Sequence, residues 1–290
     1  MKPMILAPVQ PKLLVIRYAL LVAAVFIGCS CLPWQEAAAQ GNLLITPVRV
    51  VFDGQKRAEE LNLANAGKDT ARYLISFVEI RMNRNGTFDQ IDEPDSGQLF
   101  ASKYLRFFPR SVVLAPNEAQ VIKLQVTGLS QLTPGEYRSH LYFRAVPDEL
   151  HTDDKKTQDS SGISVKLTPV FGITIPVIIR VGETNANVRL SDLSLDLATE
   201  PRLTMLFNRS GNSSVYGDIT VDYVSPQGKS TQVATARGLA VYTPNKQRYL
   251  HLPLEKNPGI NYHSGKLRIA YTVTSKSRTE QLAQAELQLR

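Results

Sequence analysis

Cysteine and histidine are scarce in this chain. Its 290 residues include two cysteines, Cys29 and Cys31, and four histidines, and none of them has the spacing of a metal site. The sequence also lacks a His-Glu-x-x-His motif, a Gly-x-Ser-x-Gly elbow and a glycine-rich phosphate loop. These absences argue against an enzyme. We expect no catalytic residue, no metal and no cofactor, and we interpret His140 and His251 as half-exposed strand residues.

Long runs of basic residues are also missing. The chain has 33 Lys and Arg against 26 Asp and Glu, a net charge of +7. No five basic residues are consecutive, and the excess is spread along the sequence. Nucleic-acid-binding proteins usually concentrate their positive charge on one patch. We therefore expect no nucleic-acid partner.

The first 39 residues have the pattern of a secretory signal. Lys12 and Arg17 precede the apolar run YALLVAAVFIGC, and small residues lead to a cleavage site after Ala39. Both cysteines precede that site, so the mature, exported chain would have no disulfide. An alternative is a lipoprotein signal with an acylated Cys29, but Phe26 and Ile27 fit that pattern poorly.

Alternating apolar and polar residues dominate the remaining sequence. Every even-numbered residue from Leu44 to Phe52 is apolar or β-branched, and the same alternation returns at 61–63 and 73–77. Asn85-Gly86 predicts a tight hairpin turn, and other turn residues recur about every ten positions. No window predicts an amphipathic helix of more than two turns. The sequence therefore predicts an all-β protein with antiparallel sandwiches of immunoglobulin type.

The most informative segment lies at 148–181. Residues 148–162 are polar and predict a mobile loop. From 163 to 181 every odd position is then apolar, which makes a strand too long for one domain to cover. Pro169 and Pro176 are expected to bend or interrupt it, which would give two core strands. The alternative is that Ile163 to Leu167 forms an open edge for another chain.

Turn-rich sequence after Val181 predicts a domain boundary. We expect a signal peptide at 1–39, one immunoglobulin-like domain at 40–182 and a second β-sandwich at 183–290. Five segments of the last part have the pattern of strands: LTMLFN, YGDITVDYV, RYLHLPL, GKLRIAYTV and AELQLR.

The order of motifs in the first domain resembles the periplasmic chaperones of the chaperone-usher pathway, which assemble pili and consist of two immunoglobulin-like domains. The motifs are TPVRVVFDG (46–54), ELNLANAGKD (60–69), FPRSVVLAPNEAQVIKLQV (108–126) and LTPGEYRSHLYFRAVP (132–147). The resemblance implies a periplasmic protein that binds pilus or fimbrial subunits, prevents their premature assembly and delivers them to an outer-membrane usher. It leaves self-association of the free protein open.

The resemblance also implies roles for particular residues. Ile163, Val165 and Leu167 match the strand that family chaperones donate to a subunit, and Arg49 matches a base that anchors the carboxylate at the subunit's C-terminus. The second base of the family is expected near 171 and 172, where this chain departs from the pattern with Phe171 and Gly172. Three alternatives follow: Lys166 or Arg180 replaces this base, the carboxylate is held less tightly, or the subunits of this protein end differently. Arg144 matches a further basic position.

A second function from a different class fits the same residues. The protein could be an exported immunoglobulin-like structural or adhesive protein whose long strand belongs to its own core. Capture of a small β-rich subunit would favour the chaperone.

Overall fold

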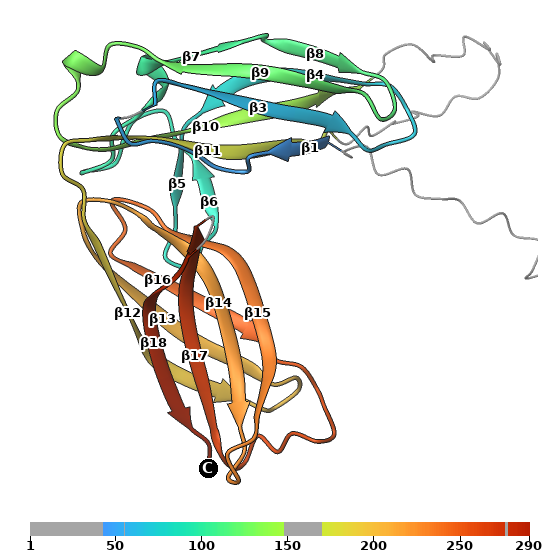
Figure 1. Cartoon of the computed structure of the whole chain (residues 1–290), viewed down its shortest axis with the longest axis vertical. Helices are drawn as coiled ribbons and strands as arrows, with labels where there is room; N and C mark the ends of the chain where they lie inside the picture. The colour runs from blue at the N-terminus through green and yellow to red at the C-terminus, as the bar shows by residue number, and fades with distance from the viewer. Residues whose placement is uncertain (1–42, 55, 148–169, 276–277) are drawn as a thin grey trace, which may run out of the picture. The chain divides into compact units, whose positions relative to one another are not determined.

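The computed structural model describes residues 43–54, 56–147, 170–275 and 278–290, and these are mostly β-strand (Figure 1). Two short 3-10 turns, Ser102–Tyr104 and Leu129–Gln131, are the helical segments of this part of the chain. Residues Gln40–Arg290 form one compact unit. The prediction of an all-β protein is confirmed.

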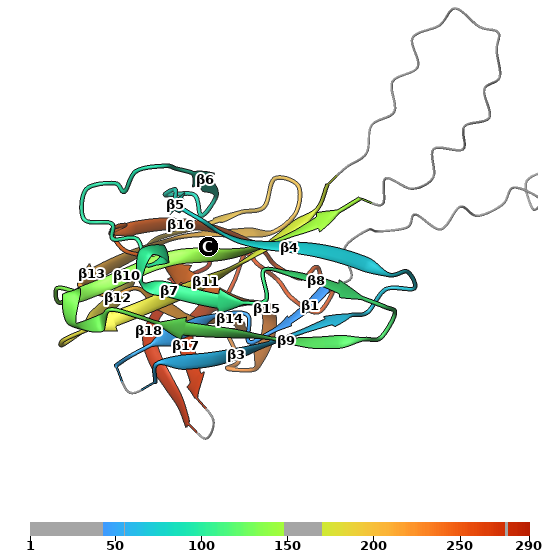
Figure 2. The ribbon, with the colours of Figure 1, turned by 90° about the horizontal axis from the view of Figure 1, so that it is seen from above.

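The first sandwich contains two sheets, with strand orders β1-β3-β9-β7 and β2-β11-β10-β4-β8. Their bounds are β1 (Leu43–Thr46), β2 (Val50–Phe52), β3 (Ala58–Asn65), β4 (Ala71–Val78), β7 (Leu105–Phe108), β8 (Ser111–Leu114), β9 (Ala119–Val126), β10 (Gly135–Val146) and β11 (Gly172–Val181). Figure 2 shows β3 beside β9 and β4 alongside β10. Leu61 and Leu124 from one sheet and Leu141 and Val177 from the other are buried in a shared core.

The segment 43–52 is divided between the two sheets. The sequence pattern suggested a single face from Leu44 to Phe52, but Leu44 and Val48 are 60% and 63% exposed, whereas Leu43 and Ile45 are buried. The buried positions change from odd-numbered residues in β1 to even-numbered residues in β2. The change occurs because β1 pairs with β3 in one sheet and β2 pairs with β11 in the other. Arg49 lies on the connection between β1 and β2.

Strand β11 contains the described half of the long alternating segment. Ile175, Val177 and Ile179 are buried in the first core, and Ile173 and Val181 pack against it. Pro176 was expected to bend or interrupt this strand. It does not interrupt it, because β11 pairs with β10 from Gly172 to Val181. The parallel pairing with β2 begins at Val177, so this short ladder does not include Pro176.

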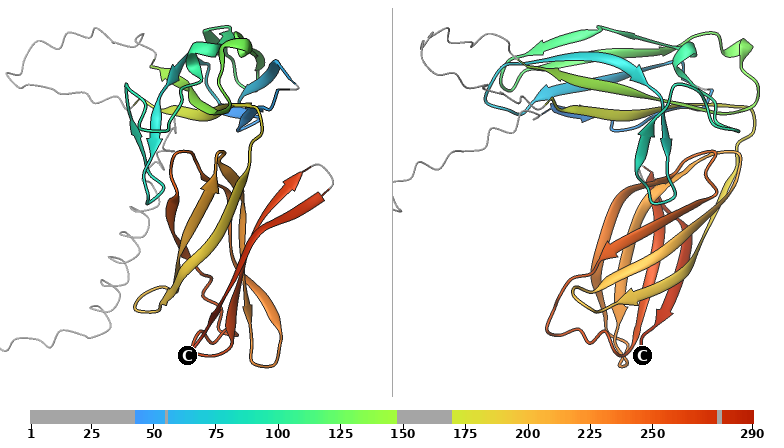
Figure 3. Two further views of the ribbon diagram at one scale, coloured as in Figure 1. Left: turned by 90° about the vertical axis from the view of Figure 1, so that its left-hand side faces the viewer. Right: turned by 180° about the vertical axis from the view of Figure 1, so that it is seen from behind.

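A separate hairpin, β5 (Ile80–Met82) and β6 (Phe88–Gln90), extends from the first sandwich (Figure 3). The predicted turn at Asn85-Gly86 is present, and the backbone N–H of Gly86 donates to the Asn83 carbonyl. Of the two turn residues only Gly86 has a positive φ, 85°. This conformation suits a residue without a Cβ.

The second sandwich has sheets ordered β12-β13-β16 and β15-β14-β17-β18. The strands are β12 (Ala186–Asp196), β13 (Arg202–Gly211), β14 (Val215–Val224), β15 (Ser230–Val241), β16 (Gln247–Pro253), β17 (Lys266–Ser275) and β18 (Arg278–Gln288). Leu203 and Leu252 on one sheet and Ile219, Val233 and Ile269 on the other share its core. The five segments that we expected to be strands overlap β13, β14, β16, β17 and β18. LTMLFN and YGDITVDYV lie wholly within their strands, and the other three extend one or two residues beyond theirs.

Several predictions concern residues that lie outside the described ones. They are the signal peptide at 1–39, the loop at 148–162, Pro169, Lys166 and the proposed donor residues Ile163, Val165 and Leu167. Within 43–54, 56–147, 170–275 and 278–290, no helix has the length and apolar character needed to cross a membrane.

Candidate functional site

Arg49 reaches from the first sandwich to an aromatic ring of the second. Its Cζ lies 4.5 Å from the centroid of the Tyr216 ring, which belongs to β14. A guanidinium over an aromatic face is attracted by the negative potential of the π system. The chain places Arg49 here because the connection between β1 and β2 crosses from one sheet to the other.

The Arg49 guanidinium has unused hydrogen-bond donors. Nε and Nη2, the two nitrogens of its side-on fork, are shielded from solvent and have no hydrogen-bond partner in the described structure. Burial lowers the pKa of Arg49, and the nearby positive charge of Arg180 lowers this pKa further. Tyr242, Glu136 and Tyr216 act in the opposite direction, but burial has the largest effect, and the pKa of Arg49 is lowered overall.

Arg180 is held by a buried carboxylate. Its Nε donates to Glu136 Oε2 at 3.0 Å, and its Nη2 donates to the Ser214 carbonyl at 3.0 Å. Glu136 Oε2 also accepts from the Ser214 backbone N–H at 3.0 Å, and Oε1 accepts from Thr243 Oγ1 at 3.1 Å. Burial by itself raises the pKa of Glu136, but hydrogen bonding from Ser214 and the charge of Arg180 outweigh burial and lower this pKa overall.

A second arginine, Arg138 on β10, is more deeply buried. Its Cζ lies 4.4 Å from the centroid of the Tyr242 ring, and Nη2 donates to the Ile80 carbonyl at 3.3 Å. Nε and Nη1 have no hydrogen-bond partner in the described structure. Burial lowers the pKa of Arg138, while Tyr242 and Glu136 act in the opposite direction.

His140, two residues further along β10, is 3% exposed, which corrects the expectation of a half-exposed side chain. Its ring lies 6.0 Å from Phe88 and 6.2 Å from Tyr242, centroid to centroid. Burial and the charge of Arg138 lower the pKa of His140 to about 3. The imidazole is therefore neutral at physiological pH.

His251 is exposed, and its Nδ1 lies 2.9 Å from Thr204 Oγ1.

Apolar contacts accompany these charges. Met82 of the hairpin, Ile178 of β11, and Ala240 and Tyr242 near the end of β15 form a small buried cluster against which Tyr216 packs. The Arg84 carbonyl accepts from the Tyr249 N–H, and the Met82 carbonyl accepts from Asn245 Nδ2. The hairpin therefore contacts both the first sandwich and strands of the second.

The arrangement has more cations than anions. Arg49, Arg138 and Arg180 lie near two carboxylates. Glu136 is already engaged by Arg180, and Glu79, close enough to Arg138 to act on its charge, accepts from Ser139 Oγ at 2.8 Å. A guanidinium can hold a carboxylate by two parallel hydrogen bonds. The site has the chemistry to bind an anion. In the described residues no three His, Cys, Asp or Glu side chains are grouped as metal ligands.

The structure brings together some of the expected basic positions and not others. Arg49 and Arg180 lie within electrostatic reach of each other. Phe171 is 49% exposed, and a side chain at Gly172 would overlap the Tyr142 ring. A base at 172 would therefore displace Tyr142. Arg144 is exposed and pairs with Gly172 across β10 and β11.

Sequence reasoning missed four residues of this site: Glu136, Arg138, Tyr216 and Tyr242. Glu136 and Arg138 alternate with the core residue Tyr137 on β10, a pattern that suggests a solvent-facing side. The structure buries that side as well. An available signal was the charged and polar residues of GEYRSH, which form the first half of β10, whereas its second half, LYFRAV, is mostly apolar.

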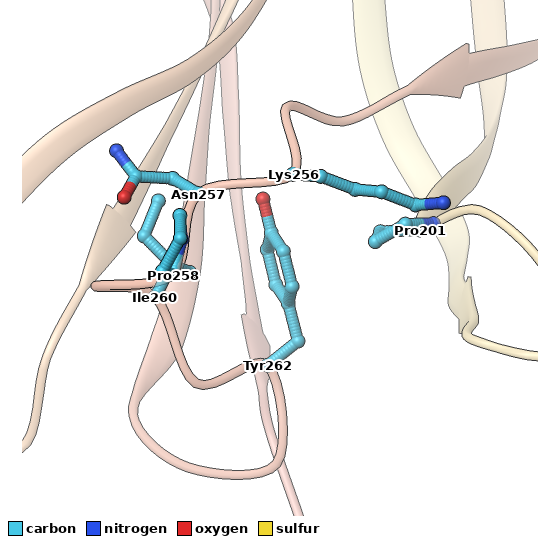
Figure 4. A pocket seen from close by; sticks show the side chains of 6 residues that line it. All are labelled: Pro201, Lys256, Asn257, Pro258, Ile260 and Tyr262. Atoms are coloured by element: carbon cyan, nitrogen blue, oxygen red, sulfur yellow. The ribbon is translucent and has the colours of Figure 1, made fainter. Parts of the chain in front are cut away.

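The second sandwich carries a small surface hollow of about 300 Å³. Figure 4 shows the Tyr262 ring at its centre, with Pro201 and Lys256 on one side and Asn257, Pro258 and Ile260 on the other. Tyr262 Oη donates to the Glu255 carbonyl at 2.8 Å. The hollow has one charged lining residue, and no residue of the Arg49 site lines it.

No family model matches the chain, and no curated protein matches it. Solved structures do match. The class 5 fimbriae chaperone CfaA is 17% identical, with 86% of this chain and 99% of that chain covered and a TM-score of 0.38. The CupB2 chaperone of Pseudomonas aeruginosa is 13% identical, with 85% and 100% covered and a TM-score of 0.41.

A third match is the complex of the chaperone CsuC with the tip subunit CsuE, from the archaic chaperone-usher Csu pili of Acinetobacter baumannii. It is 10% identical, with 84% and 97% covered and a TM-score of 0.41. Each of these three matched structures contains a protein named as a chaperone.

Proposed function

We propose that this protein is a periplasmic chaperone of a chaperone-usher pathway, without enzymatic activity. It is exported by its signal peptide, binds pilus or fimbrial subunits, prevents their premature assembly and delivers them to an outer-membrane usher. Its domains are 40–182 and 183–290. The observation that carries the proposal is the unpaired side-on fork of Arg49 beside the charge of Arg180.

Arg49 anchors the carboxylate at the C-terminus of the subunit, and Arg180 is the second basic group. Arg180 already donates to Glu136 and to the Ser214 carbonyl, which hold its guanidinium in place. Its side chain remains 25% exposed. The positive charge near Arg49 is therefore supplied from β11, although the residues at 171 and 172 are not basic.

The subunit strand pairs with the free side of β11. β10 occupies one side of β11 along its full length, whereas β2 pairs only with Val177, Ile178 and Ile179. Among the described residues, no strand pairs with Gly172 to Pro176 on the β2 side. An unpaired strand edge is a template for an added strand.

Ile163, Val165 and Leu167 continue this strand toward the subunit and donate their side chains to its groove. Complete burial of one such side chain is worth about 1.5 to 3 kcal/mol. Three of them supply roughly 5 to 9 kcal/mol before the costs of ordering and association. This amount is large enough to determine the affinity.

Purification of the tagged protein from the periplasm of its host tests the proposal. The wild-type protein should retain a small β-rich subunit, and Val165→Glu with Leu167→Glu should lose it, because a carboxylate cannot enter an apolar groove without a large desolvation penalty. Val170→Glu, at an even and 44% exposed position, is the matched control and should retain the subunit. If the wild-type protein retains no subunit, the structural or adhesive alternative is favoured.

A further inference from the structure

Arg49 is a cation in a desolvated position, and among the described residues no carboxylate is hydrogen-bonded to Nε and Nη2 of its guanidinium. The nearby carboxylate, Glu136, is occupied by Arg180, the Ser214 N–H and Thr243. What faces the Arg49 guanidinium is the ring of Tyr216, 4.5 Å from Cζ. The position of the Arg49 fork therefore depends on a residue of the second sandwich.

We propose that Tyr216 is a positioning residue for Arg49: its ring supports the guanidinium and keeps the Nε and Nη2 fork away from water and ready for a carboxylate. The inference rests on the proposed function of Arg49 as a carboxylate anchor. Tyr216 does not touch the carboxylate. It acts by holding the arginine in one orientation.

Two physical effects support this role. The ring attracts the cation through its π face, which compensates part of the cost of burying a charge. It also removes water and rotamer freedom from Arg49 before the ligand arrives, and such preorganisation increases affinity. A fork that is already desolvated gains more from two hydrogen bonds to a carboxylate than a hydrated one.

The packing around Tyr216 fixes the ring itself. Tyr216 packs against the buried cluster of Met82, Ile178, Ala240 and Tyr242. On β14 it is paired with Ala240 of β15. Its hydroxyl would lie 3.0 Å from a side chain built at Gly238, so the glycine there leaves room for the tyrosine. The ring is therefore held by both strands.

The test uses acetate as a carboxylate probe, with acetamide as the uncharged control. The Arg49 Nε–H signal of the full mature protein is followed by NMR, and it is assigned by its loss in Arg49→Lys. Tyr216→Phe keeps the π face and should bind acetate like the wild type. Tyr216→Leu and Tyr216→Met remove the face, and acetate should bind at least threefold more weakly. Methionine keeps the length of the side chain, so one variant remains informative if the other does not fold.

The matched control is Tyr249→Leu, which removes the ring under Arg84, whose Cζ lies 5.4 Å from the centroid of that ring. It should leave the acetate affinity unchanged. If acetate does not shift the Arg49 signal of the wild type, the anchor role fails together with this inference. If acetate binds equally to all the Tyr216 variants, only the role of Tyr216 is overturned. If acetate instead binds more tightly to Tyr216→Leu than to the wild type, the Tyr216 ring blocks access of the carboxylate to the Arg49 fork, and the inference is also overturned.

Discussion

At the scale of single residues, Glu136 organises the buried charges. Its side chain is fully buried, and its two oxygens accept hydrogen bonds from Arg180, the Ser214 backbone and Thr243. These donors come from β11 and from two connections of the second sandwich. The hydrogen bonds from these partners compensate the cost of burying the carboxylate. Removing one member of the buried ion pair leaves the other charge uncompensated, which destabilises the folded protein.

Replacement of Glu136 by glutamine should therefore lower the free energy of unfolding. The amide removes the charge that Arg180 and the Ser214 N–H face. Breaking a buried pair costs about 3 to 5 kcal/mol, and we expect about 3 kcal/mol because Arg180 is partly exposed. Urea denaturation of the mature protein measures the change.

The control for this substitution is Glu286→Gln. Glu286 pairs with Lys266 at 2.9 Å on the surface of the second sandwich. Exposed ion pairs contribute little to stability. If the two substitutions have equally small effects, Glu136 does not organise the site.

His140 should make the stability depend on pH. Its pKa is about 3 in the folded protein, because of burial and the charge of Arg138, and 6.5 in the unfolded chain. Between these values the unfolded chain binds the proton, so the free energy of unfolding falls as the pH is lowered from 6.5, by about 1.4 kcal/mol per pH unit. His140→Phe, which keeps a ring beside Phe88 and Tyr242, should lose less stability than the wild type between pH 7 and pH 4.5.

The comparison needs a second histidine variant. His263 is exposed, so His263→Phe should follow the wild-type pH dependence. The lowered pKa of Glu136 acts in the same direction as that of His140, and this carboxylate is present in all three proteins. An acid-induced loss in His140→Phe as large as that of the wild type would show that His140 can be protonated in the folded protein.

At the scale of elements, the β5–β6 hairpin links the two sandwiches through contacts at its turn. A Cβ built at Gly86 would lie 2.7 Å from Nε of Arg248. The Arg248 guanidinium is held by a hydrogen bond from Nη1 to the Ala240 carbonyl. The glycine at the turn therefore allows a close contact with the second sandwich as well as a positive φ.

Gly86→Ala should destabilise the protein more than Gly228→Ala. Both glycines have a φ of 85°, but the space around Gly228 is open. A left-handed conformation costs a residue other than glycine about 1 to 2 kcal/mol, and this part is common to both variants. The difference between their free energies of unfolding measures the contact with Arg248. Equal values would mean that Arg248 moves away without loss.

The elements differ in how well the sequence predicts them. Apolar alternation identified β13, β14, β16, β17 and β18, since one face of each strand lies in the second core. β12 begins at Ala186, inside a polar stretch that looked like a connection, and its side chains are mostly half-buried or exposed. β15 includes Gly238, and its register with β14 shifts at two points, which weakens the period of two.

The site was less predictable than the fold for a related reason. Arg49 was proposed as an anchor from its motif, but its neighbours come from β10, β11 and β14, far apart in sequence. Local alternation on β10 indicates that Glu136, Arg138 and His140 share a face. It does not indicate that Ser214, Tyr242 and Phe88 cover this face. The burial of this face results from contacts between strands that are distant in sequence, which local alternation cannot predict.

At the scale of the whole molecule, an open strand edge and a cationic site lie along the same strand. β11 provides both: its first half is unpaired on one side among the described residues, and Arg180 near its end lies close to Arg49. A subunit whose last strand pairs with β11 would bring its terminal carboxylate toward these arginines. The proposed function, with Arg49 as the anchor, predicts that this carboxylate contributes to capture.

The most direct measurement uses a peptide spanning the last strand of the captured subunit, with a free or an amidated C-terminus. The wild-type protein should bind the free peptide at least tenfold more tightly than the amide, since loss of one partner of a buried charged hydrogen bond costs about 2 to 5 kcal/mol. Arg49→Ala should bind the free peptide at least tenfold more weakly than the wild type, and should distinguish the two peptides much less. If amidation weakens binding to both proteins by the same factor, Arg49 does not hold the carboxylate, and the central claim is contradicted.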